Sequence, residues 1–421
     1  MDETTSVLSL DRKTPGLVPV QLALVTTHPI QYYAPLFRRV AEHKGIDLKV
    51  FYGWTGSTEK TYDPGFEQEV EWDLPLLEGY DHTFVPNEAD EPGTHHFRGM
   101  INPSLPEQVE GWGADVVLVF GWGWQSHLRT LRHFSGRIPV FFRGDSTLID
   151  ESGGLRQCAR RAGLWWVYGH VDHALYVGSR NREYFEAHGL TDEQLHWVPH
   201  AIDNDRFADP DGTKQEEAVA WRRELGIPPD APTLVFTGKL SRKKAPGLLL
   251  RAFRRLDAAD AHLVVAGSGP LEDQLRQAAP ENVYFLGFQN QSRMPVVYRL
   301  GDLFVMPSRG PGETWGLAIN EAMACGRAVV ASTKVGCAPD LIADGENNGF
   351  LFESDDVEAL ANCLDRLVSD PALREEMGTA SARRIEDWSL DAAARRLVRA
   401  VRAHVGGGTE ERAARESSSG S

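Results

Sequence analysis

Two glutamates bracket a glycine-containing segment that suits a phosphorylated ligand. Seven residues separate Glu313 from Glu321. If residues 314–321 are helical, a rise of about 1.5 Å per residue places the carboxylates roughly 12 Å apart along the axis. This distance is too long for the two catalytic carboxylates of a retaining hydrolase, which lie about 5–5.5 Å apart. It fits two carboxylates that bind hydroxyl groups at the ends of one extended ligand, such as a nucleotide sugar. The alternative is that both are ordinary solvated side chains.

The residues around these glutamates predict a strand, a turn and a helix. The apolar run Leu303–Met306 predicts the strand and Gly310–Gly312 the turn, and the helix is expected from about Thr314, which can cap it, to Gly326. Such a turn directs free backbone N–H groups and the positive end of the helix dipole to one place. We therefore expect a phosphate site here.

The pattern as a whole resembles the signature of a known enzyme family. Glu313-x-x-Gly316-Leu317-x-x-x-Glu321-Ala322-Met323-Ala324-x-Gly326, followed by residues 328–332, is similar to the signature of the retaining GT-B glycosyltransferases of family four (glycosyl transferases group 1). In that family the first glutamate contacts the donor sugar and the second holds the ribose hydroxyls. Trp315 stands where phenylalanine is usual.

The resemblance extends to a basic segment after a predicted strand. Lys239 and Lys244 match the two family cations that hold the donor diphosphate. Two positive charges would stabilise the negative charge that develops on a departing nucleotide. The alternative is a solvent-exposed basic loop without a function in binding. Gly267 lies in a turn that lacks the third glycine of a dinucleotide fingerprint, and Phe288 lies in the segment that packs the nucleobase. The resemblance thus implies a donor site formed by Gly238, Lys239, Lys244, Gly267, Phe288, Glu313, Trp315, Gly316, Leu317 and Glu321, with Glu313, Lys244 and Lys239 as the catalytic residues.

Side chains of the first half of the chain are candidates for the acceptor and sugar side of a cleft. The segments 28–37 and 198–207 also look like a bacterial branch of the family. Relatives carry a histidine near the position of Arg143 and Asp145, and its role cannot be transferred to either residue. Aromatic residues beside glycine often stack on sugars but also fill cores. The candidates are His28, Gln31, Trp122, Trp124, Arg143 and Asp145.

Two further patterns have weaker functional readings. Asp203-Asn204-Asp205 imitates a metal-binding Asp-x-Asp, but its place at a domain junction before Phe207 favours a capping role, so we expect no metal and no cofactor besides the nucleotide-sugar co-substrate. A basic and aromatic helix could meet an anionic or lipid-linked acceptor, or be a solvated face. Its residues are Arg156, Arg160, Arg161, Trp165 and Trp166.

Composition limits the class of protein. The 421 residues, 42% hydrophobic and 25% charged, suit a globular protein of two domains, and the formal net charge of −16 argues against nucleic-acid binding. No apolar run approaches the ~20 residues of a membrane span, and the N-terminus does not read as a signal peptide. Four scattered cysteines are expected to be buried thiols. We expect a cytoplasmic location, with the inner face of the membrane as an alternative.

Alternating apolar and helical segments predict the architecture that positions these residues. Strands are expected at 22–26, 48–52, 116–120, 140–143 and 174–177, and again at 233–237, 262–266, 283–285, 303–306 and 328–331. This is an α/β protein with two tandem Rossmann-like, doubly wound domains that face a central cleft, the GT-B architecture. The expected divisions are a disordered 1–17, an acceptor domain 18–206, a donor domain 207–385, a helix 386–405 that packs back toward the first domain, and a disordered 406–421. Residues 54–110 include a long loop over the cleft.

The expected activity is metal-independent transfer of a sugar from a nucleoside-diphosphate sugar to an acceptor hydroxyl, with retention of configuration. The acceptor is a glycan, a glycolipid or a natural product. Two alternatives remain: a GT-B epimerase or phosphorylase, and a non-catalytic protein that binds sugar nucleotides.

Overall fold

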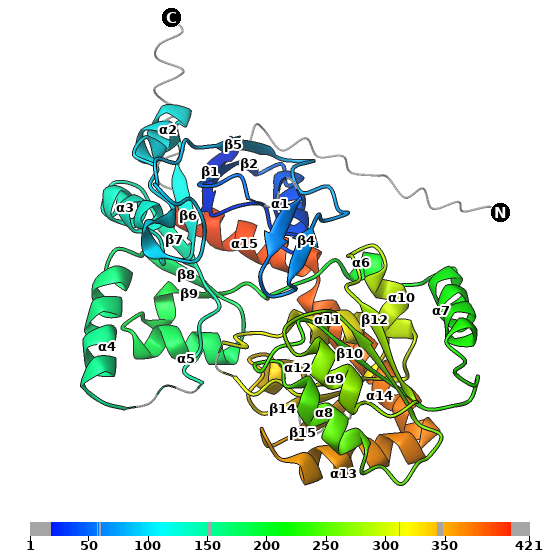
Figure 1. Cartoon of the computed structure of the whole chain (residues 1–421). Coiled ribbons are helices and arrows are strands. Elements are labelled where there is room, and N and C mark those ends of the chain that lie inside the picture. The colour runs from blue at the N-terminus through cyan, green and yellow to red at the C-terminus, as the bar shows by residue number, and fades with distance from the viewer. Residues whose placement is uncertain are drawn as a thin grey trace, which may run out of the picture.

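The computed structural model describes residues 18–56, 58, 60–149, 151, 153–310, 312–342 and 348–405. The two tails for which disorder is expected, and Pro311 of the predicted turn, lie outside these ranges. Two α/β domains stand side by side, each built on its own sheet (Figure 1). The GT-B fold class expected from the sequence is therefore confirmed.

The N-terminal domain contains a seven-stranded sheet of order β5-β2-β1-β6-β7-β8-β9, in which every pairing is parallel. Its central strands read as buried apolar runs because helices cover both faces. A separate antiparallel hairpin, β3 (Thr61–Asp63) and β4 (Gln68–Val70), lies outside the sheet. The sheet strands are β1 (Val20–Thr26), β2 (Ile46–Tyr52), β5 (Asp81–Phe84), β6 (Val116–Phe120), β7 (Val140–Arg143), β8 (His173–Tyr176) and β9 (Leu195–Trp197). The helices are α1 (Ala34–Ala41), α2 (Leu105–Trp112), α3 (Gln125–Phe134), α4 (Leu155–Tyr168) and α5 (Ser179–Ala187), with 3₁₀ turns at Phe97–Gly99 and Asp192–Gln194.

The C-terminal domain contains a six-stranded parallel sheet of order β12-β11-β10-β13-β14-β15. Its strands are β10 (Thr233–Thr237), β11 (His262–Ala266), β12 (Val283–Gly287), β13 (Leu303–Met306), β14 (Ala328–Ser332) and β15 (Gly349–Phe352). The helices are α6 (Asn204–Phe207), α7 (Thr213–Glu224), α8 (Pro246–Phe253), α9 (Glu272–Ala278), α10 (Met294–Arg299), α11 (Leu317–Ala324), α12 (Ala338–Leu341), α13 (Val357–Ser369), α14 (Pro371–Arg384) and α15 (Leu390–Val405), with a 3₁₀ turn at Ile385–Trp388.

Both sheets reverse their strand order at one point. The reversal falls between β1 and β6 in the first sheet and between β10 and β13 in the second. In doubly wound sheets ligands bind outside the carboxyl ends of the strands at this point. The topology thus directs attention to the loops that follow these strands.

Apart from the hairpin strands β3 and β4, the strands that the sequence pattern missed are edge strands. β5 and β9 close the two sides of the first sheet, and β15 closes one side of the second. An edge strand is covered less completely, and β5 (Asp-His-Thr-Phe) accordingly has an exposed or half-buried residue at every position. The continuous apolar run that identifies a central strand is therefore absent from it.

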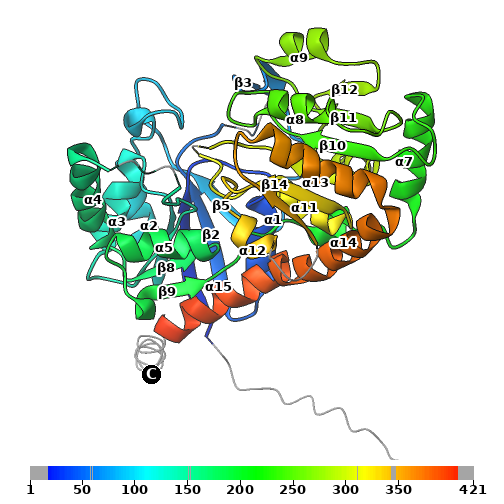
Figure 2. The ribbon, with the colours of Figure 1, turned by 90° about the horizontal axis from the view of Figure 1, so that it is seen from below.

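Helix α15 belongs in sequence to the end of the second domain but packs on the first. Its apolar stripe, which includes Leu397 and Val401, joins the core formed by α1 and the face of the first sheet. Figure 2 shows the helix running from the end of α14 along this sheet. None of the helices in the described ranges combines the length and the apolarity that a membrane span requires.

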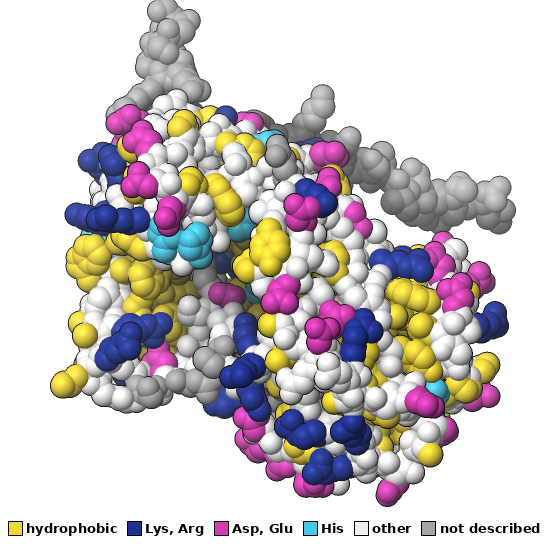
Figure 3. Space-filling view, in the orientation of Figure 1, with side chains coloured by type: hydrophobic (Ala, Val, Ile, Leu, Met, Phe, Trp, Pro, Cys, Tyr) yellow, Lys and Arg dark blue, Asp and Glu magenta, His cyan; other side chains and the backbone are white. Residues whose placement is uncertain are grey.

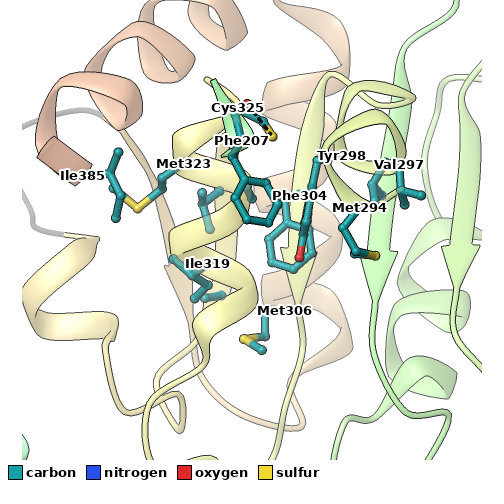
Figure 4. Packing of buried hydrophobic residues seen from close by; sticks show 14 of the residues in the cluster. Phe207, Met294, Val297, Tyr298, Phe304, Met306, Ile319, Met323, Cys325 and Ile385 are labelled. Atoms are coloured by element: carbon teal, nitrogen blue, oxygen red, sulfur yellow. Dashed lines mark hydrogen bonds between the residues drawn. The ribbon is translucent and has the colours of Figure 1, made fainter. Parts of the chain in front are cut away.

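The core of the C-terminal domain lies directly beneath the segment with the two glutamates. Phe207, Tyr298 and Phe304 pack against one another next to α11 (Figure 4). Cys325 is buried in this core as expected, whereas Cys158 is exposed because it lies on the open face of α4. That expectation for Cys158 was wrong.

The docking of α15 gives a stability prediction. Leu397 is 1% exposed, so Leu397→Ala should remove about 2–5 kcal/mol from the free energy of unfolding. Arg399→Ala, at an exposed position of the same helix, should change it by less than about 0.5 kcal/mol. Urea unfolding followed by circular dichroism measures both. Equal midpoints for Leu397→Ala and the parent protein would show that α15 does not hold the N-terminal domain together.

Candidate functional site

A cavity of about 370 Å³ lies at the carboxyl edge of the C-terminal sheet, under the hairpin of the N-terminal domain. Figure 3 shows the hollow between the domains, with acidic and basic side chains at its margin. Most of the expected donor-binding positions reach it. Its walls are formed by Gln31, Tyr32, Asp63, Phe66, Trp72, Thr237, Gly238, Lys239, Lys244, Ala266, Gly267, Phe288, Gln289, Gln291, Met294, Ala318 and Glu321.

Lys244, which lines this cavity, forms an ion pair with Glu313, which is not among the lining residues. Lys244 Nζ lies 2.7 Å from Glu313 Oε2, and Ser308 Oγ donates to the same oxygen at 3.1 Å. Glu313 is 7% exposed. Burial would raise the pKa of Glu313, but Lys244, with help from Lys243 and Ser308, holds it below the usual value. The carboxylate is therefore charged and oriented at neutral pH.

Lys239 forms an ion pair across the domain boundary. Its Nζ lies 2.7 and 2.9 Å from the two carboxylate oxygens of Asp63, at the end of β3. The ammonium group also lies 4.8 Å from the ring centre of Phe66. Burial opposes the charge of Asp63, but Lys239 and the N–H groups of residues 65 and 66 lower its pKa overall. Both expected diphosphate cations thus have carboxylate partners.

Glu321 projects from α11 into the cavity. Tyr298 Oη donates to Glu321 Oε2 at 2.6 Å, and Thr237 Oγ1 lies 3.0 Å from the same hydroxyl group. Burial raises the pKa of Glu321, and the hydrogen bond from Tyr298 partly offsets this effect. The carboxylate retains an oxygen for a ligand hydroxyl group.

Two glycines allow the loops after β10 and β11 to approach each other. Gly238 and Gly267 have φ angles of 130° and 136°, and a Cβ on Gly267 would lie 2.0 Å from the carbonyl oxygen of Gly238. Only glycine fits such a contact. Backbone from two loops can therefore face the ligand directly.

The N-terminal domain contributes residues that the sequence interpretation did not identify. Phe66 and Trp72 of the hairpin segment lie near Phe288, with ring centres 5.0 and 6.2 Å from it. Ser268 Oγ donates to the carbonyl oxygen of Phe66, and the Asn290 side-chain amide donates to that of Glu71. The composition of residues 54–110 indicated a loop over the cleft, but no spacing singled out Asp63, Phe66 or Trp72.

The expected helix start at Thr314 was wrong. α11 begins at Leu317, and Gly316 is its N-cap residue with a φ angle of 102°. Thr314 Oγ1 instead donates to Asp145 Oδ2 across the domain boundary at 2.7 Å. A Cβ on Gly316 would lie 2.7 Å from Val335 Cγ1, so close packing as well as backbone conformation requires glycine at this point.

Trp315 is buried in the core, whereas Leu317 lines a cavity. The Trp315 indole is 3% exposed, belongs to the core and donates to Asn320 Oδ1 at 2.9 Å, so the structure does not give it the expected donor contact. Leu317 lines a smaller cavity of about 180 Å³ that shares Gln31, Tyr32 and Glu321 with the larger one.

Arg143 does not face the cleft, contrary to expectation. The guanidinium is 1% exposed and donates to the carbonyl oxygens of Val198 (2.8 Å) and Pro199 (3.1 Å). Burial lowers the pKa of Arg143. The buried guanidinium of Arg143 lies beneath the segment that links the domains. The backbone carbonyl oxygens of this segment compensate for the water that the charged group loses on burial.

The other N-terminal candidates serve mainly local packing. His28 contacts Thr27 Oγ1 at 2.9 Å and the edge of Trp54, and burial lowers its pKa to about 4. Trp122 packs on the apolar core, and Trp124 Nε1 donates to the Thr94 carbonyl oxygen. None of these three side chains lines either cavity described above. The capping role expected for Asp203 is confirmed, because its Oδ1 accepts from the Arg206 N–H at the start of α6.

Comparison with known proteins places the chain in a family. The sequence model described as "Glycosyl transferases group 1" matches residues 218–384. A D-inositol 3-phosphate glycosyltransferase of Streptomyces bingchenggensis is 31% identical over 336 residues, 71% of each chain. A GDP-mannose-dependent monoacylated alpha-(1-6)-phosphatidylinositol monomannoside mannosyltransferase of Corynebacterium glutamicum is 30% identical over 58% of this chain and 64% of the relative. The chain thus matches somewhat less than two thirds of that relative's length.

Solved structures share the fold. Anabaena Alr3699/HepE in complex with UDP and glucose superposes with a TM-score of 0.69 at 17% identity, over 91% of this chain and 100% of the other. The catalytic domain of starch synthase IV from Arabidopsis thaliana gives 0.67 at 16% identity, over 92% and 99%. With the sequence matches, this shows that the chain belongs to the glycosyl transferases group 1 family and has its two-domain GT-B fold.

Proposed function

We propose that this protein transfers a sugar from a nucleoside-diphosphate sugar to an acceptor hydroxyl group, with retention of anomeric configuration and without a catalytic metal ion. The observation that carries the proposal is the single cavity lined by Lys239, Lys244 and Glu321. Two cations from one basic segment and a carboxylate from the motif around α11 lie around one space large enough for a nucleotide.

The charges suit a diphosphate between the domains. Lys239 and Lys244 lie on the loop after β10, and the N-terminus of α11 follows β13, so both features lie at one sheet edge. Charge builds on the leaving phosphate as the glycosidic bond breaks, and preorganised cations stabilise it more in the transition state than in the ground state. The lysines therefore do the electrostatic work that a metal ion does elsewhere.

The aromatic wall suits the nucleobase. Phe288 of the C-terminal domain and Phe66 and Trp72 of the hairpin form an apolar end to the cavity. Glu321 lines the same cavity as this wall and the lysines, and we assign the ribose hydroxyl groups to it.

Retention is best explained by attack on the same face from which the nucleotide leaves. Glu313 is held by Lys244 and Ser308 and contacts the sugar rather than acting as a nucleophile. The acceptor oxygen bonds to the anomeric carbon, the bond from that carbon to the phosphate oxygen breaks, and this phosphate oxygen takes the acceptor proton. Atoms and charge balance without another reactant.

The acceptor would approach from the N-terminal domain, and a lipid-linked acceptor is the class we favour. Both relatives described above are named for inositol-containing acceptors, one of them a lipid. On α4, Trp165 and Trp166 are 61% and 50% exposed, and Arg156 is exposed near the start of the same helix. Such a face suits contact with an anionic lipid surface. An epimerase, a phosphorylase or a non-catalytic binder would use the same cavity but would form no glycosylated acceptor.

The ribose assignment gives a binding prediction. Glu321→Ala should weaken binding of the best nucleoside diphosphate among UDP, GDP, ADP and dTDP by about 1.5–3 kcal/mol, the value of hydrogen bonds to a charged group. Calorimetry of folded protein measures this change. Glu281→Ala, at an exposed position of the same domain, should bind normally. Unchanged affinity in Glu321→Ala would remove Glu321 from the ribose site.

The diphosphate assignment gives a kinetic prediction. Lys244→Ala should lower turnover about 10²–10³-fold, as loss of one preorganised charge-stabilising group does. The product of the parent enzyme should have the anomeric configuration of the donor by NMR. Lys44→Ala removes the same charge from an exposed position and should turn over normally. Inverted product, or a fully active Lys244→Ala protein, is incompatible with the proposed mechanism.

A further inference from the structure

Three histidines far apart in the sequence meet on the face of the N-terminal sheet that α15 covers. His173 is the first residue of β8, His196 lies in β9, and His404 lies in the last turn of α15. One nitrogen from each ring lies within 4.8 Å of those from the other two. His173 Nδ1 and His196 Nε2 are 3.2 Å apart, and the His404 ring centre lies 3.9 Å from that of His173 and 4.9 Å from that of His196.

Backbone geometry explains why the rings face one another. In the parallel pairing of β8 and β9, His196 is in register with Leu175. Since side chains alternate across a strand, His173 and Leu175 lie on one face. On α15, His404 follows Leu397 by seven residues and Val401 by three, so it projects from the side of the helix that faces the sheet, although its own position near the helix end is exposed.

The arrangement matches the needs of a transition-metal ion. Zinc binds histidine nitrogen at about 2.0–2.1 Å in a tetrahedral site, so two such ligands lie roughly 3.3 Å apart. The separation of 3.2 Å between the His173 and His196 nitrogens agrees with this value. His404 Nδ1 contacts the Ala400 carbonyl oxygen at 2.8 Å, which fixes the ring and leaves Nε2 for a ligand bond, the usual arrangement at metal-bound histidines.

We propose that His173, His196 and His404 form a divalent transition-metal site, with zinc as the natural occupant. The histidines are half-buried or exposed, so a water molecule completes the coordination. The ion joins the end of α15 to two strands of the N-terminal sheet. It is a structural clamp at the start of β8, at the edge of the sheet opposite the carboxyl ends where the donor cavity lies, and it takes no part in sugar transfer.

The test is metal binding by the untagged full-length chain after treatment with EDTA and dialysis. Titration with ZnCl₂ should saturate at one ion per chain and raise the melting temperature, because an ion that binds only the folded state stabilises it. CoCl₂ should give the visible absorption of a four-coordinate ion with nitrogen ligands. Absence of both saturable zinc binding and this spectrum in the parent protein overturns the proposal.

Variants locate the ion. His404→Gln and His196→Gln should each weaken zinc binding by at least about tenfold, since even outer-shell changes cost 10–100-fold, and should lose the melting shift. The matched control is His95→Gln/His96→Gln, which removes the other histidine cluster of the described residues, Glu91, His95 and His96. If zinc affinity falls in the control and not in His404→Gln or His196→Gln, the ion lies elsewhere and the proposal is wrong.

Chelation separates this site from the chemistry of the donor cavity. EDTA should lower the melting temperature of the metal-loaded protein while sugar transfer, measured below the melting transition, continues. Loss of transfer that only magnesium or manganese restores would contradict the metal-independent mechanism but not the histidine site. A melting temperature unaffected by EDTA would contradict the clamp.

Discussion

The pairing of two lysines that line the cavity with carboxylates is the interaction on which the proposed donor site depends. The chain carries a formal net charge of −16, so an anionic substrate meets an unfavourable field except where cations are concentrated. Lys244 is held by Glu313 within the C-terminal domain, and Lys239 by Asp63 of the N-terminal hairpin. The paired carboxylates orient the two lysine side chains, and in the proposed function a diphosphate replaces at least part of these contacts.

In the proposed function, this constraint links nucleotide binding to the arrangement of the two domains. The hairpin that supplies Asp63 also supplies Phe66 and Trp72 to the cavity, and Ser268 and Asn290 bind its backbone. The C-terminal domain alone therefore forms only part of the binding surface. Helix α15, which packs on the first domain after leaving the second, and the Thr314–Asp145 hydrogen bond restrict how far the halves can separate.

Much of the fold follows from the sequence because the central strands are buried on both faces and read as apolar runs. The edge strands β5, β9 and β15 do not, since one side of each lacks a partner. The residues that the C-terminal domain contributes to the site could also be predicted from the sequence, because they lie in continuous segments and their motif is long. Asp63, Phe66 and Trp72 reach the cavity only through the folding of a long irregular segment, which no local pattern encodes. Arg143 and Trp315 were expected at the site because of their place in the sequence, but both side chains are buried. Arg143 binds the backbone of the segment that links the domains, and Trp315 packs in the core. The histidine cluster joins residues 173, 196 and 404, a spacing that no ligand motif contains.

The central claim is that one diphosphate lies between Lys239 and Lys244 with the ribose at Glu321. A crystal structure of the protein with its preferred nucleoside diphosphate tests it most directly. The account predicts both lysine Nζ atoms within about 4 Å of phosphate oxygens, the ion-pair limit, a ribose hydroxyl group bonded to Glu321, and the Lys239–Asp63 contact lengthened or lost. A nucleotide bound in this cavity with both lysines still paired only to Asp63 and Glu313, or with its ribose remote from Glu321, would contradict the account.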